Sequence, residues 1–303
     1  GGAVTVYVKV ENKNYVTVQT SGTVTITKAP LTIEADSQTW TYDNTKHTDS
    51  GYSVSATNKL QGTDAISAIT VTGEITDVGT CDNVPSSAVV KNGTTDVTAN
   101  YEISYVKGTL TVTQSGALTA TVTSYSGTYD SESHSIAVAA TGAAGSAATT
   151  ISYSTDKTNW STTAPEYKNI TGGAVTVYVK VENKNYVTVE TSGTVTITKA
   201  PLTITANSHS WTYTSSVHKD SGYSVSTTDK LQGSDTVSAI TVTGEITNAG
   251  TADNTITPSS VVIKDGSEDV TGNYSITCNK GTLEVTKAPL AITANSNSWV
   301  YTS

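Results

Sequence analysis

Apolar and polar residues alternate with a period of two over several short stretches of this chain. The clearest stretch is 174–182, where valines occupy every second position and Thr, Tyr, Lys and Glu lie between them. Successive side chains of a strand point to opposite faces, so this pattern predicts a strand with one buried face and one wet face. The same alternation predicts strands over 68–75, 101–106 and 193–199. No stretch keeps a period of 3.6 residues, and we therefore predict an all-β protein.

Turn residues separate the predicted strands. An Asn-Gly or Asp-Gly pair between two strands favours a tight hairpin, because both turn residues must take positive φ. This signal predicts hairpins at Asn92-Gly93 and at Asp265-Gly266. A Lys-Gly pair comes later in each case, and we expect it to form the hairpin that leads into a last strand, at Lys107-Gly108 and Lys280-Gly281.

The chain repeats itself. Residues 1–28 recur as residues 172–199 with one difference, Gln19 against Glu190. The motif TITKAPL marks a seam at Thr25–Leu31 and again at Thr196–Leu202, and VTKAPL marks a third seam at Val285–Leu290. Self-similarity at a fixed spacing is typical of proteins built from tandem units, so the seams divide the chain into repeats.

Two kinds of repeat are present, which we name A and B. Both A repeats carry the same motifs in the same order, from LTI and WTY through DSGYSVS and KLQG to AITVTGEIT, NY and KGTL. The second A repeat has two extra residues near Thr255–Pro258. The predicted organisation is the C-terminal part of a B repeat (1–28), a first A repeat (29–114), a complete B repeat (115–199), a second A repeat (200–287) and the N-terminal part of a further A repeat (288–303).

Each complete repeat is predicted to be an immunoglobulin-like β-sandwich, since it holds several short strands with a turn about every 8–12 residues. At three seams a Lys, an Ala and a Pro join one repeat directly to the next, at Pro30, Pro201 and Pro289. Proline fixes φ and no flexible linker intervenes, so we expect stiff joints and an elongated tandem array. The seam at 114–116 lacks Pro and is expected to bend more.

Composition supports this prediction and excludes several functions. The 303 residues include 16 Tyr and 4 Trp but no Phe, Met or Arg, and Thr, Ser, Val and Gly are abundant. β-Branched and aromatic side chains suit pleated sheets. The net charge is −9, and this acidity without Arg argues against nucleic-acid binding. No apolar run reaches the roughly 18–20 residues of a membrane span.

The motifs of the A repeat resemble those of the MBG-type immunoglobulin-like repeats of large Gram-positive cell-surface proteins. The segments that carry this resemblance include KAPLTITANSHSWTY, AITVTGEITNAGTADN and KGTLEVTKA. The B repeat, with SGTYDSESHSI, ISYSTDKTNWS and VYVKVENKNYVTV, is similar to a sister repeat of the same proteins. The resemblance covers nearly the whole chain. It implies secretion, tandem arrays, attachment to the cell wall and a stalk or adhesin role, and it supplies no catalytic residues.

Reactive side chains are few and scattered. One His recurs in each complete repeat, and we expect it to serve the fold, for example by bonding across a turn. Cys81 and Cys278 lie at unrelated positions of different repeats and are expected to be free thiols. We predict no enzymatic activity, no cofactor and no metal site, since neither zinc-ligand spacing nor a dense acidic loop is present. Calcium between repeats and Lys–Asn crosslinks are alternatives that the sequence leaves open.

Aromatic residues are the best candidates for contacts. Trp40 and Tyr42 share a strand face, as do Trp211 and Tyr213, and we expect them to pack in the core or against the preceding repeat. Trp160 lies instead in the polar run TDKTNWSTT. Its ring could stack on a sugar or a partner protein, or fold back over its own repeat. Trp160, and Tyr178 on the wet face of the 175–181 strand, are the predicted ligand contacts.

The leading functional hypothesis is a structural stalk or filament of tandem repeats outside a bacterial cell, on its surface or wall. Its partners are neighbouring repeats of the same chain and possible lateral copies in a filament. The competing hypothesis is an adhesin whose repeats bind host glycan or protein directly through Trp160 and Tyr178. Neither hypothesis involves nucleic acid, a cofactor or a membrane span in this segment.

Overall fold

Strands account for nearly all of the regular structure. The computed structural model describes residues 2–303, and in that range the other regular elements are 3₁₀ turns at Thr98–Asn100, Pro258–Ser260 and Thr271–Asn273. Contacts group the chain into two compact units. The first comprises Gly1–Ala120, Ala140–Ile151 and Val181–Val189, and the second comprises Thr121–Ala139, Ser152–Lys180 and Glu190–Ser303. The prediction of an all-β protein is confirmed.

The first A repeat, in the first unit, forms two sheets over one core. One sheet has the strand order β4-β10-β7-β6 with β8 beside β7, and the other has the order β5-β3-β9. Leu31 and Ile33 from one sheet and Val90 from the other are fully buried in the same cluster as Tyr101. The strands are β3 (Ala29–Ala35), β4 (Gln38–Thr41), β5 (Tyr52–Val54), β6 (Ala65–Thr72), β7 (Gly79–Asn92), β8 (Thr95–Asp96), β9 (Tyr101–Val106) and β10 (Gly108–Thr113).

The start of this repeat is divided between the two sheets. β3 pairs in parallel with β9, whereas β4 pairs in parallel with β10. The remaining pairs, β3 with β5, β7 with β10, β6 with β7 and β7 with β8, are antiparallel. Two largely antiparallel sheets packed over a shared core define an immunoglobulin-like sandwich, so the predicted fold class is confirmed.

The hairpins predicted at Lys107-Gly108 and Lys280-Gly281 are both wrong, because in each A repeat the strands on either side of the Lys-Gly pair belong to different sheets. β9 ends at Val106 and β10 begins at Gly108, but the two strands belong to different sheets and do not pair. A Cβ on Gly108 would collide with the backbone oxygens of Ala35 and Asp36. The glycine therefore lets the chain cross from one sheet to the other against the β3–β4 backbone.

Hairpins form at both predicted places, but the prediction that Asn92 and Asp265 are turn residues with positive φ is wrong, since both pair as the last residues of their strands. Gly93 has φ of 60° between β7 and β8, which pair antiparallel with Asn92 opposite Thr95. Gly266 has φ of 59° between β25 (Val262–Asp265) and β26 (Glu268–Asp269), which also pair antiparallel. Glycine takes positive φ at little cost, which explains its place in both turns.

The second A repeat, in the second unit, has the same plan. Its sheets have the orders β21-β19-β27, β20-β28-β24-β23 and β22-β25-β26. Where the first A repeat has the continuous β7, a 3₁₀ turn at Pro258–Ser260 separates β24 from β25, next to the two extra residues. The other strands are β19 (Ala200–Ala206), β20 (His209–Thr212), β21 (Tyr223–Val225), β22 (Thr236–Ala239), β23 (Val242–Thr243), β24 (Gly250–Ile256), β27 (Tyr274–Asn279) and β28 (Gly281–Thr286).

The B repeat contributes residues to both units. In the first unit β11 (Ser115–Ala117) pairs in parallel with β17 (Tyr186–Val187). In the second unit β13 (Tyr125–Thr128) pairs in parallel with β18 (Val189–Thr198), in a sheet of order β13-β18-β16-β15. Val177, Val179 and Val181 of β16 (Val175–Glu182) are fully buried, which confirms the face predicted from the alternation. The remaining strands are β12 (Thr119–Thr123), β14 (Ala137–Thr141) and β15 (Thr150–Ser154).

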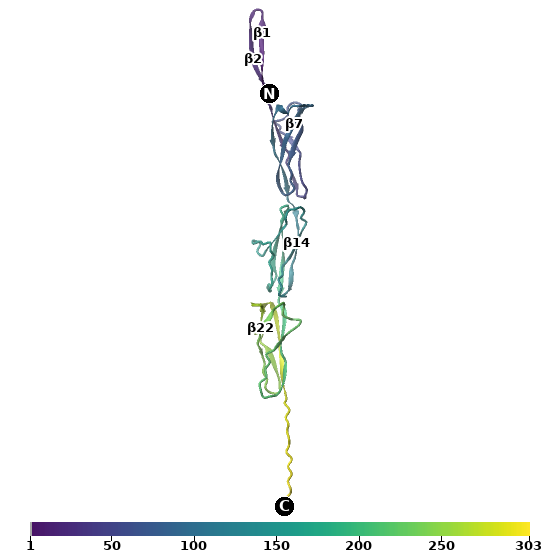
Figure 1. Cartoon of the computed structure of the whole chain (residues 1–303), viewed down its shortest axis with the longest axis vertical. Coiled ribbons are helices and arrows are strands. Elements are labelled where there is room, and N and C mark those ends of the chain that lie inside the picture. The colour runs from purple at the N-terminus through teal and green to yellow at the C-terminus, as the bar shows by residue number, and fades with distance from the viewer. Residues whose placement is uncertain (1) are drawn as a thin grey trace. The chain divides into compact units, whose positions relative to one another are not determined.

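The two end segments carry the least structure. β1 (Ala3–Asn12) and β2 (Tyr15–Thr25) form a two-stranded antiparallel hairpin (Figure 1). All residues of both strands are exposed. Residues 288–303 contain no strand and are exposed. The boundaries assigned to the repeats stay a prediction. Within residues 2–303, no helix is long and apolar enough to cross a bilayer.

Candidate functional sites at the repeat junctions and in an aromatic hollow

Two tyrosine positions recur in every complete repeat. The first lies just after the strand that begins the second sheet, and we name it the exit tyrosine: Tyr42, Tyr129 and Tyr213. The second is the Tyr of an Asn-Tyr pair at the start of a later strand. We name the pair and the residue before it the entry loop: Ala99-Asn100-Tyr101, Lys184-Asn185-Tyr186 and Gly272-Asn273-Tyr274.

In the first unit the exit tyrosine of the first A repeat packs on the entry tyrosine of the B repeat. The rings of Tyr42 and Tyr186 meet edge to face, with centroids 5.5 Å apart and planes at 77°. The Tyr42 hydroxyl donates to the backbone oxygen of Ala144 at 2.9 Å, and the Ala144 amide donates to the Tyr186 hydroxyl at 2.8 Å. Both phenols are buried and hydrogen-bonded, so the contact combines aromatic packing with satisfied polar groups. We name this contact the A–B junction.

In the second unit the exit tyrosine of the B repeat packs on the entry tyrosine of the second A repeat. Tyr129 and Tyr274 also meet edge to face, with centroids 5.5 Å apart and planes at 78°. Both hydroxyls donate to Oδ2 of Asp235, from 3.0 Å and 2.6 Å respectively. Burial, and then the bond to this carboxylate, raise the pKa of both phenols above 10.0. We name this contact the B–A junction, and it repeats the ring geometry of the A–B junction.

At each of the two junctions the Asn of the entry loop forms a second pair of bonds. At the A–B junction the Val78 amide donates to Oδ1 of Asn185 at 2.9 Å, and Nδ2 of Asn185 donates to Asp77 at 2.9 Å. Lys184 adds an ion pair with Asp77 at 2.6 Å. The bonds from Lys184, and then from Asn185, lower the pKa of the Asp77 carboxyl below 3.8.

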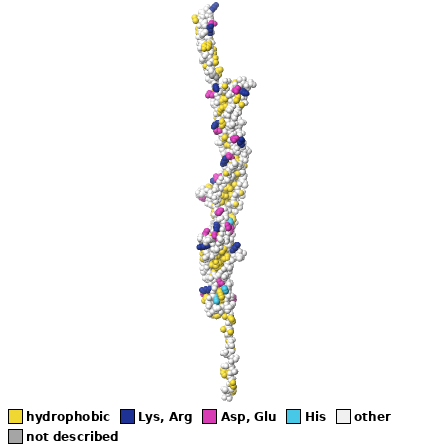
Figure 2. Space-filling view, in the orientation of Figure 1, with side chains coloured by type: hydrophobic (Ala, Val, Ile, Leu, Met, Phe, Trp, Pro, Cys, Tyr) yellow, Lys and Arg dark blue, Asp and Glu magenta, His cyan; other side chains and the backbone are white. Residues whose placement is uncertain are grey.

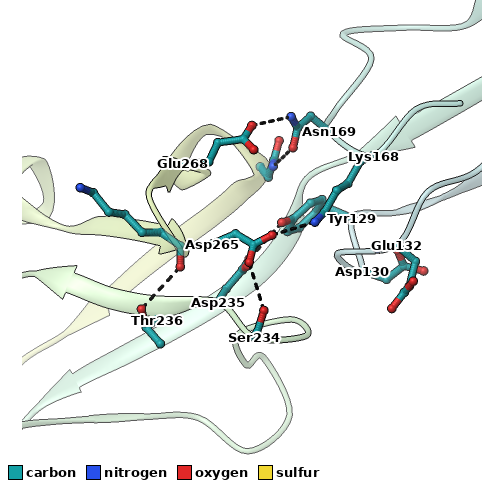
Figure 3. A network of polar contacts seen from close by, with 12 residues as sticks. Tyr129, Asp130, Glu132, Lys168, Asn169, Ser234, Asp235, Thr236, Asp265 and Glu268 are labelled. Atoms are coloured by element: carbon teal, nitrogen blue, oxygen red, sulfur yellow. Dashed lines mark hydrogen bonds and ion pairs between the residues drawn. The ribbon is translucent and has the colours of Figure 1, made fainter.

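The B–A junction uses the same amide geometry with other chemistry (Figure 3). The Ile170 amide donates to Oδ1 of Asn273 at 3.2 Å, and Nδ2 of Asn273 donates to Asn169 at 2.7 Å. Nδ2 of Asn169 in turn donates to Glu268 at 3.2 Å. Asn169 thus occupies the place that Asp77 holds at the A–B junction.

An ion pair lies beside this network, between Lys168 and Asp265 at 2.7 Å. Ser234 also donates to Asp265, at 3.0 Å. The bond to Lys168, followed by the bond from Ser234, lowers the pKa of the Asp265 carboxyl, and the same ion pair raises the pKa of Lys168. The B–A junction therefore joins two stacked tyrosines, an amide pair and a partly exposed ion pair.

The connections along the chain at these junctions are one residue long. β10 ends at Thr113 and β11 begins at Ser115, while β18 ends at Thr198 and β19 begins at Ala200. Gln114, the residue between β10 and β11, donates from its amide to the backbone oxygens of Lys184 and Tyr186. This side chain therefore bonds the seam that lacks Pro to the entry loop of the B repeat.

The recurring histidines bond across their turns. The Nε2 atom of each ring lies within hydrogen-bond distance of the residue four positions earlier, which is Asp43, Asp130 or Thr214. The backbones of the three histidines also form isolated antiparallel bridges outside the named strands, His47 to Ile75, His134 to Tyr167 and His218 to Ile246. Their rings stack on aromatic neighbours, with centroids 4.7 Å apart for Trp40 and His47 and 3.9 Å apart for Tyr125 and His134. Such contacts are those of side chains that hold a loop in place. The hydroxyls of Thr45 and Thr214 lie 3.5 Å and 3.1 Å from Nε2 of His47 and His218, and Asp43 contacts the same Nε2 as Thr45, so these groups lack the order of a catalytic triad.

The predicted ligand contacts, Trp160 and Tyr178, lie together in the second unit. They line one surface hollow of about 300 Å³ with Lys157, Glu190, Thr191 and Ser192. The indole of Trp160 donates to the backbone oxygen of Lys157 at 3.2 Å, so the ring is anchored to its own loop. Lys180 lies 5.0 Å from the centre of that ring, and Lys157 lies 4.6 Å from the centre of the Tyr178 ring. Both aromatic rings are thus covered partly by cations of the same repeat.

Two aromatic predictions need correction. Tyr213, expected to pack in the core or against the preceding repeat, is 41% exposed. Tyr42 packs against the repeat that follows it, whereas the sequence favoured the core or the preceding repeat. Trp40, two residues before Tyr42, stacks on His47 instead. The entry tyrosines were not predicted as contacts, although the recurring Asn-Tyr pair is visible in the sequence and could have indicated them.

Neither the charged side chains visible in Figure 2 nor the metal-ligating side chains of the described residues gather at one place. On the face drawn in Figure 2, acidic side chains and lysines are interspersed. Among residues 2–303, no three His, Cys, Asp or Glu side chains come together in a group that could hold a metal ion. Cys81 and Cys278 are both free thiols, as predicted.

Comparisons with known proteins give no family. A scan of the sequence against protein-family models finds no match, and a search of curated proteins also finds none. Solved structures with some likeness include Sidekick-1 immunoglobulin domains 1–5, with 10% identity and a TM-score of 0.32 over 84% of this chain. This chain spans 58% of that Sidekick-1 chain. The insect immune protein hemolin matches with 11% identity and a TM-score of 0.28, over 95% of this chain and 92% of its own. These scores are low, so the fold assignment rests on strand order and pairing.

Proposed function

We propose that this chain is part of a structural stalk or filament of tandem immunoglobulin-like repeats on a bacterial cell surface. In this proposal the repeats act on one another and carry out no catalysis. The tyrosine junctions hold each repeat against the next and make the array resist bending. Extracellular placement and bacterial origin belong to the proposal and are supported by the MBG-like motifs of the A repeat.

The observation that carries this proposal is the recurrence of one contact in two chemical settings. The ring centroids are 5.5 Å apart at both junctions, and the interplanar angles are 77° and 78°. One junction joins an A repeat to a B repeat and the other joins a B repeat to an A repeat. An edge-to-face pair contributes about 0.5–1.5 kcal/mol beyond the apolar area that it buries. Removing one partner also leaves buried hydrogen-bonding groups unpaired.

Small-angle scattering of the whole chain tests the proposal. We expect an extended profile for the natural sequence, and greater flexibility for the double variant Tyr42→Ala/Tyr129→Ala, which removes both exit tyrosines. Tyr15→Ala is the matched control, since Tyr15 is exposed in the hairpin and should leave the profile unchanged. A compact or freely jointed profile for the natural sequence would contradict a stalk.

The second candidate function is adhesion through the hollow that Trp160 and Tyr178 line. What favours it is that the structure brings these two rings to one surface, with Lys157 and Glu190 at the same hollow. Aromatic rings beside polar groups suit the stacking and hydrogen bonding that sugars require.

A glycan array with the whole chain tests this second function. Binding by the natural sequence that is lost in Trp160→Ala would support an adhesin. Tyr125→Ala, which changes an aromatic ring of the same repeat outside the hollow, is a suitable control. If neither the natural chain nor Trp160→Ala binds any glycan, direct glycan recognition by this hollow is excluded.

A further inference from the structure

We name the surface around each exit tyrosine the exit face. Equivalent residues of the three exit faces can be identified from a backbone bridge that all three repeats share. Ile75, Tyr167 and Ile246 each pair with the recurring His of their own repeat. Two residues later the chain reaches Asp77 in the first A repeat, Asn169 in the B repeat and Asn248 in the second A repeat. The next residue is Val78 in the first A repeat and Ile170 in the B repeat, and its amide donates to the Asn of the entry loop at each junction. The equivalent residue of the second A repeat is Ala249.

The first of these positions varies together with the entry loop that it meets. Asp77 meets an entry loop with Lys before Asn-Tyr, and it accepts bonds from Lys184 and Asn185. Asn169 meets an entry loop with Gly in that place, and it accepts from Asn273 while donating to Glu268. Asp on the exit face and Lys in the entry loop form one complementary combination. Asn on the exit face, with Gly in the entry loop and Glu268 nearby, forms the other. An Asp at position 169 would face Glu268 with no cation supplied by the loop, which is unfavourable.

The exit face of the second A repeat is open. Its exit tyrosine, Tyr213, is 41% exposed, whereas Tyr42 is 3% and Tyr129 is 1% exposed. Asn248 and Ala249 are exposed, although Asp77 and Val78 at the matching positions are half-buried. Tyr213 and Ala249 line a hollow of about 590 Å³ together with residues 287–290. This is the surface that an entry loop covers at the A–B junction.

We propose that this face is a docking surface for the entry loop of an A repeat, and that the residue at 77, 169 or 248 selects which kind of repeat can follow. The occupant is an entry loop with Gly or Ala before Asn-Tyr, which Asn248 suits as Asn169 does. Residues 288–303 agree with this choice, because they match the start of the second A repeat except at Ala291, Asn297 and Val300. The inference rests on the proposed stalk function, since it concerns the order of repeats in that array.

Substitutions at residues 169 and 272 of the B–A junction test, in the whole chain, whether the exit-face residue selects the entry loop. Asn169→Asp should speed hydrogen exchange of the Ile170 amide about tenfold, because the bond that Asn169 donates to Glu268 is replaced by repulsion between two carboxylates, which pushes residue 169 away from Asn273. Adding Gly272→Lys should restore slow exchange by supplying the cation that Asp77 finds in Lys184. A Cβ on Gly272 would meet no atom within 4 Å, so this position has room for a side chain. The Val78 amide of the other junction is the internal control and should not change.

Extending the chain tests the docking surface itself. Appending a copy of residues 216–287 after Ser303 completes an A repeat, and this should slow exchange of the Ala249 amide about tenfold. Replacing residues 288–303 by a copy of 115–199 instead presents an entry loop with Lys, and should protect Ala249 less. With Asn248→Asp, the extension by residues 115–199 should protect the Ala249 amide more than the A extension does. The amides of the appended strands report whether each extension has folded.

Each outcome bears on the proposal. Equal protection of Ala249 by both folded extensions, or no protection by the A extension, overturns the docking proposal. Fast exchange at Ile170 that Gly272→Lys fails to restore overturns the selection of the entry loop by the exit-face residue. Small-angle scattering decides the stalk function separately, so a stiff array with no preference between extensions would leave the function standing and remove only this inference.

Discussion

Residues 1–28 and 172–199 have almost the same sequence and opposite environments. Val6 and Val8 are 47% and 49% exposed in the hairpin, whereas their counterparts Val177 and Val179 are fully buried in the B repeat. In the described chain β1 and β2 pair only with each other. In the B repeat the same residues meet the other strands of a sandwich. The alternating pattern therefore determines that a strand forms and which face is apolar, while the rest of the repeat determines whether that face is buried.

The partners also change the strand itself. In the hairpin β2 runs without a break from Tyr15 to Thr25. The matching segment of the B repeat is divided into β17 and β18, because β11 pairs with one part and β13 pairs with the other. The same residues thus make one strand or two, according to which neighbours bind their backbone groups.

The largest difference is expected from one substitution made in both copies. Val179→Asp places an unpaired charge in a fully buried site and should destabilise the B repeat by more than about 4 kcal/mol. Val8→Asp, at the matching position of the hairpin, should change stability by less than about 0.5 kcal/mol. Denaturant unfolding of the two variants measures the contrast. Equal effects would mean that the hairpin valines are covered in solution as well.

The tyrosines of the two loops give the next largest contrast. Tyr186→Ala removes a buried ring from the A–B junction and should cost about 3 kcal/mol. Tyr15→Ala removes the matching ring, which is 79% exposed, and should have almost no effect on stability. Calorimetry measures both changes. A loss in Tyr15→Ala as large as that in Tyr186→Ala would show that the hairpin loop also docks.

The lysines of the two loops should differ in their dependence on pH. Lys184 holds the pKa of Asp77 below 3.8, so the stability from this pair is present above that value and is lost as the pH falls through the lowered pKa. Lys184→Ala should therefore be less stable than the natural chain at neutral pH, and the difference should vanish in acid. Lys13→Ala should match the natural chain at every pH. A pH-independent loss in Lys184→Ala would assign its effect to packing.

The smallest effect is expected at the one position where the two copies differ. Glu190→Gln makes residues 172–199 identical to residues 1–28 and should change stability by less than about 0.5 kcal/mol. Glu190 lines the hollow of Trp160 and Tyr178, so its charge matters there and not for the core. Hydrogen exchange of the Val179 amide should stay slow. A loss of this protection would show that the sequence difference, and not the surroundings, keeps β16 buried.

Much of the fold could be predicted from local pattern. The β9 bounds match the prediction of 101–106, the valine face of β16 is as expected, and hairpins form at both predicted Asn-Gly and Asp-Gly places, although only the glycines take positive φ. The Lys-Gly pair was misread because it resembles a hairpin locally, and only the pairing of β9 with β3 and of β10 with β4 shows that the chain changes sheets there. A turn signal reports backbone conformation and carries no information on which strands pair.

The junctions were the least predictable part of the molecule. The Tyr and Asn-Tyr positions can be found as repeated letters, but Tyr42 and Tyr186 are far apart along the chain and their contact depends on two folded sheets. Asp77 and Lys184 likewise meet only because the entry loop reaches the exit face. Sequence by itself determined the period of the strands, the turns and the order of the repeats, because these depend on residues close together in the chain. Tertiary structure decided which faces are dry and which tyrosines stack, because burial and ring contacts exist only once distant strands are brought together.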